Sequence, residues 1–192
     1  MIHKPTILGI SGSLSEPSRT VALVRALLQQ FGIQATTRLL DLAQDAPALF
    51  ATTPKGVRNE KAAAIIQAVE TADLLVVGSP VYRASYTGAL KHLFDLVDYR
   101  ALRGTPVVLC ATGGTPLHGL MPEHQLRPLF GFFGAVTVPS FVYALESDFD
   151  GYVLRSPEVQ ERIERTVAEA KAQLSLVSAR RTADVLPIAI NA

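Results

Sequence analysis

The sequence predicts an α/β protein in which one parallel sheet lies between two layers of helices, the doubly wound three-layer architecture. Short apolar runs alternate with longer segments of helical spacing along nearly the whole chain, which is the pattern of βαβ units. Several of these runs are continuously apolar, as expected of strands that are covered on both faces. The 192 residues, 48% hydrophobic and 18% charged, are enough for one substantial core.

Five runs predict the strands of this sheet. The first run is apolar and stops at Gly12, and the third is the clearest strand of the chain. The second run is more polar, so we expect it near an edge. The predicted strands are residues 6–11, 34–40, 73–80, 105–111 and 135–143. Parallel connections of this kind are nearly always right-handed.

Five segments predict helices, which are residues 18–31, 59–71, 87–97, 122–133 and 157–176. Ser18 is a suitable N-cap for the first helix and Gly32 a suitable C-cap, while Pro157 suits the first turn of the last. Residues 41–55 contain Pro47 and Pro54, and we expect a long connection with at most one short helical turn.

The chain is expected to divide into one domain, residues 1–177, and a C-terminal tail, residues 178–192. The tail has no helical or strand periodicity, yet several of its residues are apolar. We therefore expect residues 185–190 to pack on a neighbouring subunit.

Composition excludes several classes of protein. A formal net charge of +1 argues against a large nucleic-acid-binding surface. The longest apolar runs fall far short of the roughly 20 residues of a membrane span, and the N-terminus has no signal-peptide pattern, so we expect a cytoplasmic protein. A single cysteine, Cys110, excludes an internal disulfide and a cysteine-based zinc cluster, and we predict no metal site.

The first loop that carries chemistry, residues 12–20, joins the first strand to the first helix. Ser13, Ser15, Ser18 and Thr20 offer hydroxyl groups beside the free amides of a helix N-terminus. Arg19 offers a guanidinium that is able to fork onto one phosphate. The loop has neither a dinucleotide nor a Walker glycine pattern, which favours a single phosphate monoester. The alternative is a serine-rich turn with an ordinary N-cap.

Two further loops follow the third and fourth strands. In residues 79–91, Pro80 ends the strand, and Tyr82 and Tyr86 flank a short irregular segment that offers a flat wall to a planar ring. Taken alone, tyrosines are more often packing aromatics. Residues 112–115 lack bulky side chains, so a ligand is able to approach their amides. Ligands of doubly wound sheets bind at this edge, and flavin mononucleotide (FMN) fits the three loops best.

The motifs Gly-Ser-x4-Ser-Arg-Thr, Ser-Pro-Val-Tyr-Arg-Ala-Ser-Tyr-Thr-Gly-Ala-Leu-Lys and Ala-Thr-Gly-Gly-Thr resemble those of the NAD(P)H-dependent FMN reductase family. Within it, the chain is most similar to the reductase components of two-component alkanesulfonate and methanesulfonate monooxygenase systems. The resemblance implies a flavodoxin-like fold with strand order 2-1-3-4-5, FMN with NADH or NADPH, and a homo-oligomer, either dimer or tetramer. It also implies a partner monooxygenase that receives reduced FMN.

The resemblance also assigns site residues. Those implied to hold the phosphate are Ser13, Ser18, Arg19 and Thr20, with Ser15 in the same loop. Those implied to line the ring are Pro80, Val81, Tyr82 and Arg83, and those facing its pyrimidine end are Thr112, Gly113 and Gly114. Relatives often carry a basic residue where this chain has Ser15, which implies a lower phosphate affinity, suited to a flavin that leaves.

The expected chemistry needs no catalytic side chain. Hydride transfer from a nicotinamide to a flavin requires neither a protein nucleophile nor a metal, and the amides of Gly113 and Gly114 are suited to stabilise the developing negative charge. The alternative function is that of a reductase for quinones, azo compounds or chromate that keeps its FMN, because the same three loops would serve such an enzyme. A flavodoxin-type electron carrier is disfavoured by the net charge of +1, and the nicotinamide preference stays open.

The helix over residues 122–133 contains a proline, Pro128, whose missing N–H leaves the carbonyl of His124 without its helical donor. This predicts either a π-bulge or an ordinary proline kink. The resembling two-component reductases have a π-type insertion in this helix, at a subunit interface. Apolar residues occupy more than one face of the helices over 87–97 and 122–133, which also predicts an interface; they are Leu90, Leu93, Phe94, Leu126, Leu129, Phe130, Phe132 and Phe133.

Overall fold

The computed structural model describes residues 4–53, 56 and 59–185. Its centre is a five-stranded parallel sheet with the order β2-β1-β3-β4-β5, which confirms the doubly wound fold and its flavodoxin-like order. The strands are β1 (Thr6–Ser11), β2 (Thr36–Asp41), β3 (Leu74–Pro80), β4 (Pro106–Gly113) and β5 (Val136–Leu145).

The central strands are apolar because helices cover both of their faces. All of β3 is buried, and so is all of β4 except Gly113. As predicted, the more polar strand β2 lies at an edge, where Thr36, Thr37 and Arg38 are exposed. The burial pattern thus follows the sequence pattern strand by strand.

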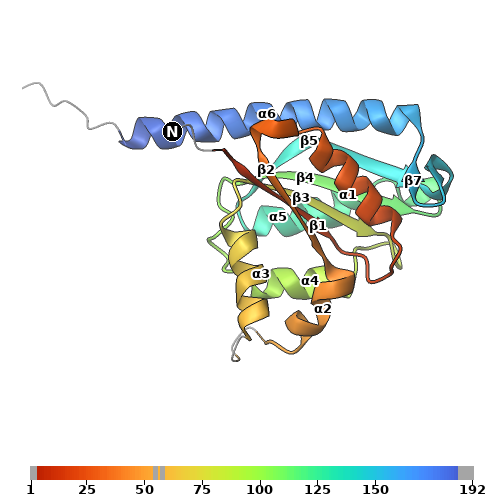
Figure 1. The fold of residues 1–192 in the computed structure, drawn as a ribbon, viewed down its shortest axis with the longest axis horizontal. Coiled ribbons are helices and arrows are strands. Elements are labelled where there is room, and N and C mark those ends of the chain that lie inside the picture. The colour runs from red at the N-terminus through yellow and green to blue at the C-terminus, as the bar shows by residue number, and fades with distance from the viewer. Residues whose placement is uncertain (1–3, 54–55, 57–58, 186–192) are drawn as a thin grey trace, which may run out of the picture.

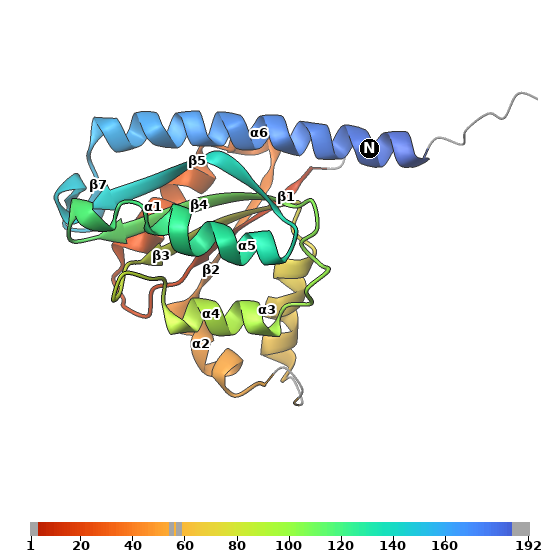
Figure 2. The same cartoon turned by 180° about the vertical axis from the view of Figure 1, so that it is seen from behind.

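Helices form a layer on each side of the sheet (Figures 1 and 2). The helices α1 (Arg19–Gln29) and α6 (Pro157–Val185) cover one face; the other face carries α2 (Leu42–Phe50), α3 (Glu60–Glu70), α4 (Gly88–Leu96) and α5 (Arg127–Phe132). Ser18 is the N-cap of α1, as predicted, but the C-cap is Gln30. Gly32 turns the chain after the helix has ended, with φ +66°.

The segment 41–55 is not the long connection that its prolines suggested. It contains α2, whose N-cap Asp41 accepts a hydrogen bond from the amide of Ala43. Leu42, Ala46 and Leu49 are buried, at the spacing of one helical face. Burial of this stripe against the neighbouring helices α3 and α4 outweighs the hydrogen bond that Pro47 removes inside the helix.

The last helix is longer than predicted, because α6 continues to Val185. The expected boundary at residues 177 and 178 therefore falls inside a helix, and the segment from 178 to 185 is not irregular. No glycine or proline interrupts the chain between Pro157 and Pro187, so nothing stops the helix earlier. The contact predicted for residues 185–190 lies almost wholly outside the described residues. None of the described helices is long and apolar enough to span a bilayer.

The helix predicted over residues 122–133 begins with a π-helical segment, Pro122–Leu126, before α5. The amide of Arg127 donates to the carbonyl of Pro122, five residues earlier, which is the bonding pattern of a π-helix. The irregularity includes His124 and lies directly before Pro128. It is therefore a π-segment rather than a simple proline kink.

The apolar residues of α4 and α5 are mostly buried within the subunit, contrary to the expectation that one sheet face would leave many exposed. The two helices contact each other as well as the sheet: Phe94 packs edge-on against Phe130, with ring centroids 4.9 Å apart, and also contacts Phe133. Only Phe132, at 72% exposure, and the half-buried Leu129 remain outside this core.

Candidate functional site

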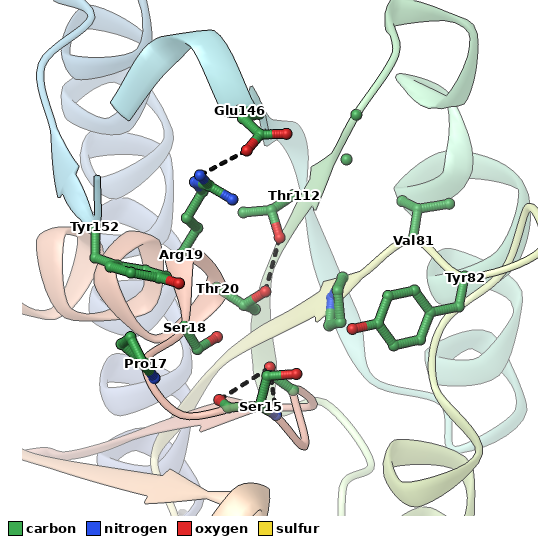
Figure 3. Close-up of a pocket in the computed structure, with 14 residues that line it drawn as sticks. Ser15, Pro17, Ser18, Arg19, Thr20, Val81, Tyr82, Thr112, Glu146 and Tyr152 are labelled. Carbon is green, nitrogen blue, oxygen red and sulfur yellow. Dashed lines mark hydrogen bonds and ion pairs between the residues drawn. The ribbon is translucent and has the colours of Figure 1, made fainter. Parts of the chain in front are cut away.

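The three loops that the sequence singled out meet at the carboxyl edge of the sheet and line one cavity of about 300 Å³ (Figure 3). Its walls come from the β1–α1 loop, the end of β3, the end of β4 and the connection between β5 and α6. The lining residues are Ser13, Ser15, Pro17, Ser18, Arg19, Thr20, Pro80, Val81, Tyr82, Thr112, Gly113, Gly114, Glu146 and Tyr152.

Every cofactor-binding residue that the resemblance assigns, except Arg83, lines this cavity. Tyr86, which was expected to flank a planar ring with Tyr82, packs against the core instead. Arg83 is exposed and lies with Ala84 at the tip of a tight turn, where their φ values are +52° and +63°. Tyr82 and Ser85 close the turn through two backbone hydrogen bonds of 2.9 and 3.1 Å. Two successive non-glycine residues with positive φ are strained, and the turn carries Arg83 past the cavity wall.

Three lining residues were not predicted: Pro17, Glu146 and Tyr152. The last two belong to the connection after β5, which forms a small hairpin of β6 (Phe149–Asp150) and β7 (Val153–Leu154). These strands are too short to give a period-two pattern. The Asp-Gly pair at the hairpin turn is the one signal that was available.

The start of α1 is arranged to receive an anion. The hydroxyl of Ser18 accepts a hydrogen bond of 3.3 Å from the amide of Val21, and helix geometry leaves the amides of Arg19 and Thr20 without an intrahelical acceptor. The hydroxyl of Thr20 lies 2.7 Å from that of Thr112 in a buried hydrogen bond. This bond joins the start of α1 to the end of β4 and so fixes these two walls of the cavity relative to each other.

Arg19 is already engaged inside the cavity. Its Nη2 lies 2.6 Å from Glu146 Oε1, and its Nε donates to the carbonyl of Gly151 at 3.1 Å. The guanidinium also lies over the ring of Tyr152, 5.3 Å from its centroid. Figure 3 shows the side chain turned toward Glu146, while Ser15 lies at the opposite end of the cavity.

Another wall of the cavity is formed by the main chain of Gly113 and Gly114. Beneath Gly113, Tyr143 donates its hydroxyl to the carbonyl of Thr115 at 2.7 Å. Burial raises the pKa of Tyr143 above its ordinary value. The ring of Tyr143 therefore supports the loop beside Gly113.

Replacing Gly113 with alanine is expected to destabilise the protein by about 1–3 kcal/mol, the usual cost of overpacking. A Cβ there would overlap the hydroxyl of Tyr143 and lie 3.1 Å from its Cζ, which forces the ring to move. The measurement is the free energy of unfolding from urea denaturation.

The matched control is Gly114→Ala, because a Cβ at Gly114 meets nothing within 4 Å. Its free energy of unfolding should match that of the wild type. Equal losses for the two variants would contradict the account of Tyr143 as a support.

The single cysteine does not line the cavity. Cys110 is fully buried in β4, and burial strongly raises the pKa of its thiol, which makes it an inert core residue. Within the described part of the chain, no three His, Cys, Asp or Glu side chains gather as a metal site would require. The cavity therefore brings together the hydroxyl groups and free amides at the start of α1, the main chain of Gly113 and Gly114, and the apolar side chains of Pro80 and Val81.

Comparison with known proteins agrees with this chemistry. The sequence model of the family described as NADPH-dependent FMN reductase matches residues 5–150. The chain belongs to this family. It is an oxidoreductase whose reaction uses FMN and a reduced nicotinamide nucleotide.

Similar FMN reductases occur in pseudomonads. The chain is 47% identical over 170 residues to FMN reductase (NADPH) of Pseudomonas aeruginosa, covering 88% of this chain and 91% of that one. It is 49% identical over 177 residues to the NADH-dependent FMN reductase SfnF of Pseudomonas putida, covering 88% and 94%. These two relatives are named for different nicotinamide cofactors.

Solved structures show the same fold. An oxidoreductase from Corynebacterium diphtheriae superimposes with a TM-score of 0.80 at 33% identity, covering 91% of this chain and 98% of that one. The apo form of the NADH:FMN oxidoreductase EmoB gives a TM-score of 0.78 at 30% identity, covering 90% of each. This FMN reductase therefore shares its fold over nearly the whole chain with other oxidoreductases.

Proposed function

We propose that this FMN reductase binds oxidised FMN reversibly, reduces it with NADH or NADPH, and releases reduced FMN to a separate monooxygenase of sulfonate sulfur assimilation. The observation that supports flavin binding is the cavity itself, which is lined both by the hydroxyl-rich start of α1 and by Gly113 and Gly114 at the end of β4. The partner part is supported by the similarity of the loop motifs to reductase components of two-component sulfonate monooxygenases, and by relatives named SfnF and SfnE.

The roles of the lining residues follow from their chemistry. The amides at the start of α1, with Ser18 and Arg19, would hold the phosphate. Bound FMN supplies a ring that accepts a hydride from the nicotinamide. Pro80 and Val81 would flank this ring, and the amides of Gly113 and Gly114 would stabilise negative charge at its pyrimidine edge. The task of the protein is positioning, without an acid–base side chain.

Steady-state kinetics with NADH and with NADPH, each with and without added FMN, test this proposal. We expect the purified protein to be nearly colourless and its oxidation of NAD(P)H to depend on added FMN. A yellow protein that reduces quinones, azo compounds or chromate without added flavin would instead be a reductase with a resident cofactor. Comparing the two nucleotides at saturating FMN gives the nicotinamide preference.

We further propose that the chain forms a homo-oligomer, a dimer or a tetramer, through the surface around α5. Exposed apolar side chains near the π-segment support this: Phe132 is 72% exposed, Leu117 90% and Leu120 58%. His124, in the π-segment, and Pro128, in α5, are also exposed. Packing of a second copy would remove this apolar surface from water.

Replacing Pro128 with alanine is expected to weaken the oligomer or change flavin retention. The variant regains an amide N–H at position 128, which allows an ordinary helical hydrogen bond to the carbonyl of His124 and favours loss of the π-segment. Sedimentation velocity at micromolar concentration and FMN titration measure the two effects. A wild-type monomer, together with a Pro128→Ala variant of unchanged kinetics, would contradict both the interface and the role of this residue.

A further inference from the structure

We propose that Glu146 competes with the flavin phosphate for Arg19 and thereby sets how readily FMN leaves the site. The inference rests on the proposed function, because it assumes that the phosphate lies at the start of α1. It assigns a specificity-determining role to a residue of the β5–α6 connection, outside the three loop motifs. The role is to lower affinity for the phosphate group without touching the flavin ring.

The competing contact is direct. Glu146 lines the cavity, and its carboxylate lies 2.6 Å from Nη2 of Arg19. The backbone that carries Glu146 is fixed by its own element, because Glu146 starts a 3-10 turn whose last residue, Asp148, accepts a 2.7 Å hydrogen bond from the amide of Leu145. The connection between β5 and α6 thus presents an anion to the arginine of the β1–α1 loop (Figure 3).

A carboxylate and a phosphate compete for a guanidinium because both accept the same N–H donors in a fork. The side chains of Arg19 and Glu146 are 32% and 67% exposed, and ion pairs with this exposure are weak. A phosphate that also contacts the amides of α1 is therefore able to displace Glu146. The displaced charge stays at the rim of the cavity, so phosphate binding is weakened but not prevented.

Arg19 does not depend on Glu146 for its place in the cavity. Its Nε is bound to the carbonyl of Gly151, and its guanidinium lies over the ring of Tyr152. Both contacts come from the hairpin and remain when Glu146 is neutralised. The effect of neutralising Glu146 is therefore a change in the charge that Arg19 faces, rather than a loss of the arginine.

The test is titration of the flavin-free protein with FMN and with riboflavin, which lacks the phosphate, followed by quenching of flavin fluorescence. For Glu146→Gln we expect about three- to tenfold tighter FMN binding, the size of a partly exposed charge interaction, and slower FMN release. Riboflavin affinity should not change. Glutamine keeps the shape of the side chain and its ability to accept a hydrogen bond.

The matched control is Glu16→Gln, which removes the same charge within the β1–α1 loop from an exposed residue that does not line the cavity. It should change FMN affinity less than Glu146→Gln does. Equal gains would show a general charge effect and overturn the proposal.

A double variant separates competition from simple repulsion. In an Arg19→Ala background, Glu146→Gln should have little further effect on FMN affinity, because the shared guanidinium is absent. A full gain in that background would overturn competition at Arg19. If the wild type binds FMN and Glu146→Gln binds it equally well, this inference fails alone, whereas a wild type that binds no FMN contradicts the proposed function itself.

Discussion

Replacing Arg19 with alanine is expected to weaken FMN binding by about 1.5–3 kcal/mol, the range for a lost charge-assisted hydrogen bond. Arg19 is the cation that lines the cavity beside the free amides of α1. Affinity for riboflavin should fall far less, because riboflavin has no phosphate to contact the guanidinium. Fluorescence titration of both flavins against the flavin-free variant measures the difference.

Two further variants sharpen this result. Arg25→Ala removes the same charge from an exposed position farther along α1 and should leave FMN affinity nearly unchanged. Arg19→Lys keeps the charge but not the fork, so an intermediate loss is expected. If Arg19→Ala reduced FMN and riboflavin affinity equally, Arg19 would not belong to a phosphate site.

The largest effect on stability is expected for Phe130→Ala, which should lower the free energy of unfolding by about 3–5 kcal/mol. Phe130 is fully buried and packs edge-on against Phe94, with an interplanar angle of 83°. Its removal leaves a cavity between α4, α5 and the sheet. Urea denaturation monitored by far-UV circular dichroism gives the value.

The neighbouring residue supplies the control. Phe132 is 72% exposed, so Phe132→Ala should change the free energy of unfolding of the subunit by no more than about 0.5 kcal/mol. The same variant should weaken the oligomer if the surface around α5 is the interface. A large loss of subunit stability for Phe132→Ala, or a small one for Phe130→Ala, would contradict the packing described for this helix.

The sequence alone was sufficient to predict the architecture of the sheet and most of the residues that line the cavity. Continuous apolar runs identify strands buried on both faces, and right-handed crossovers bring their carboxyl ends to one edge. For that reason the loops after β1, β3 and β4 were predicted to meet, and all their assigned residues except Arg83 line one cavity. The N-cap signal was also sufficient, as Ser18 shows at the start of α1, whereas the predicted C-cap Gly32 lies beyond the true C-cap, Gln30.

Only the tertiary structure decided the features that depend on contacts distant in sequence. The helix α2 forms because the helices α3 and α4 bury its apolar stripe despite Pro47. The burial of Phe94 and Phe130 depends on contact between α4 and α5.

The partners of Arg19, Glu146 and Gly151, lie more than 120 residues away. They belong to a 3-10 turn and a hairpin that are both too short to leave a periodic pattern. The spacing of residues in the sequence predicts the secondary structure of one element at a time. The carboxylate that faces Arg19 comes from a distant segment, and only the folding of the two segments against each other brings it there.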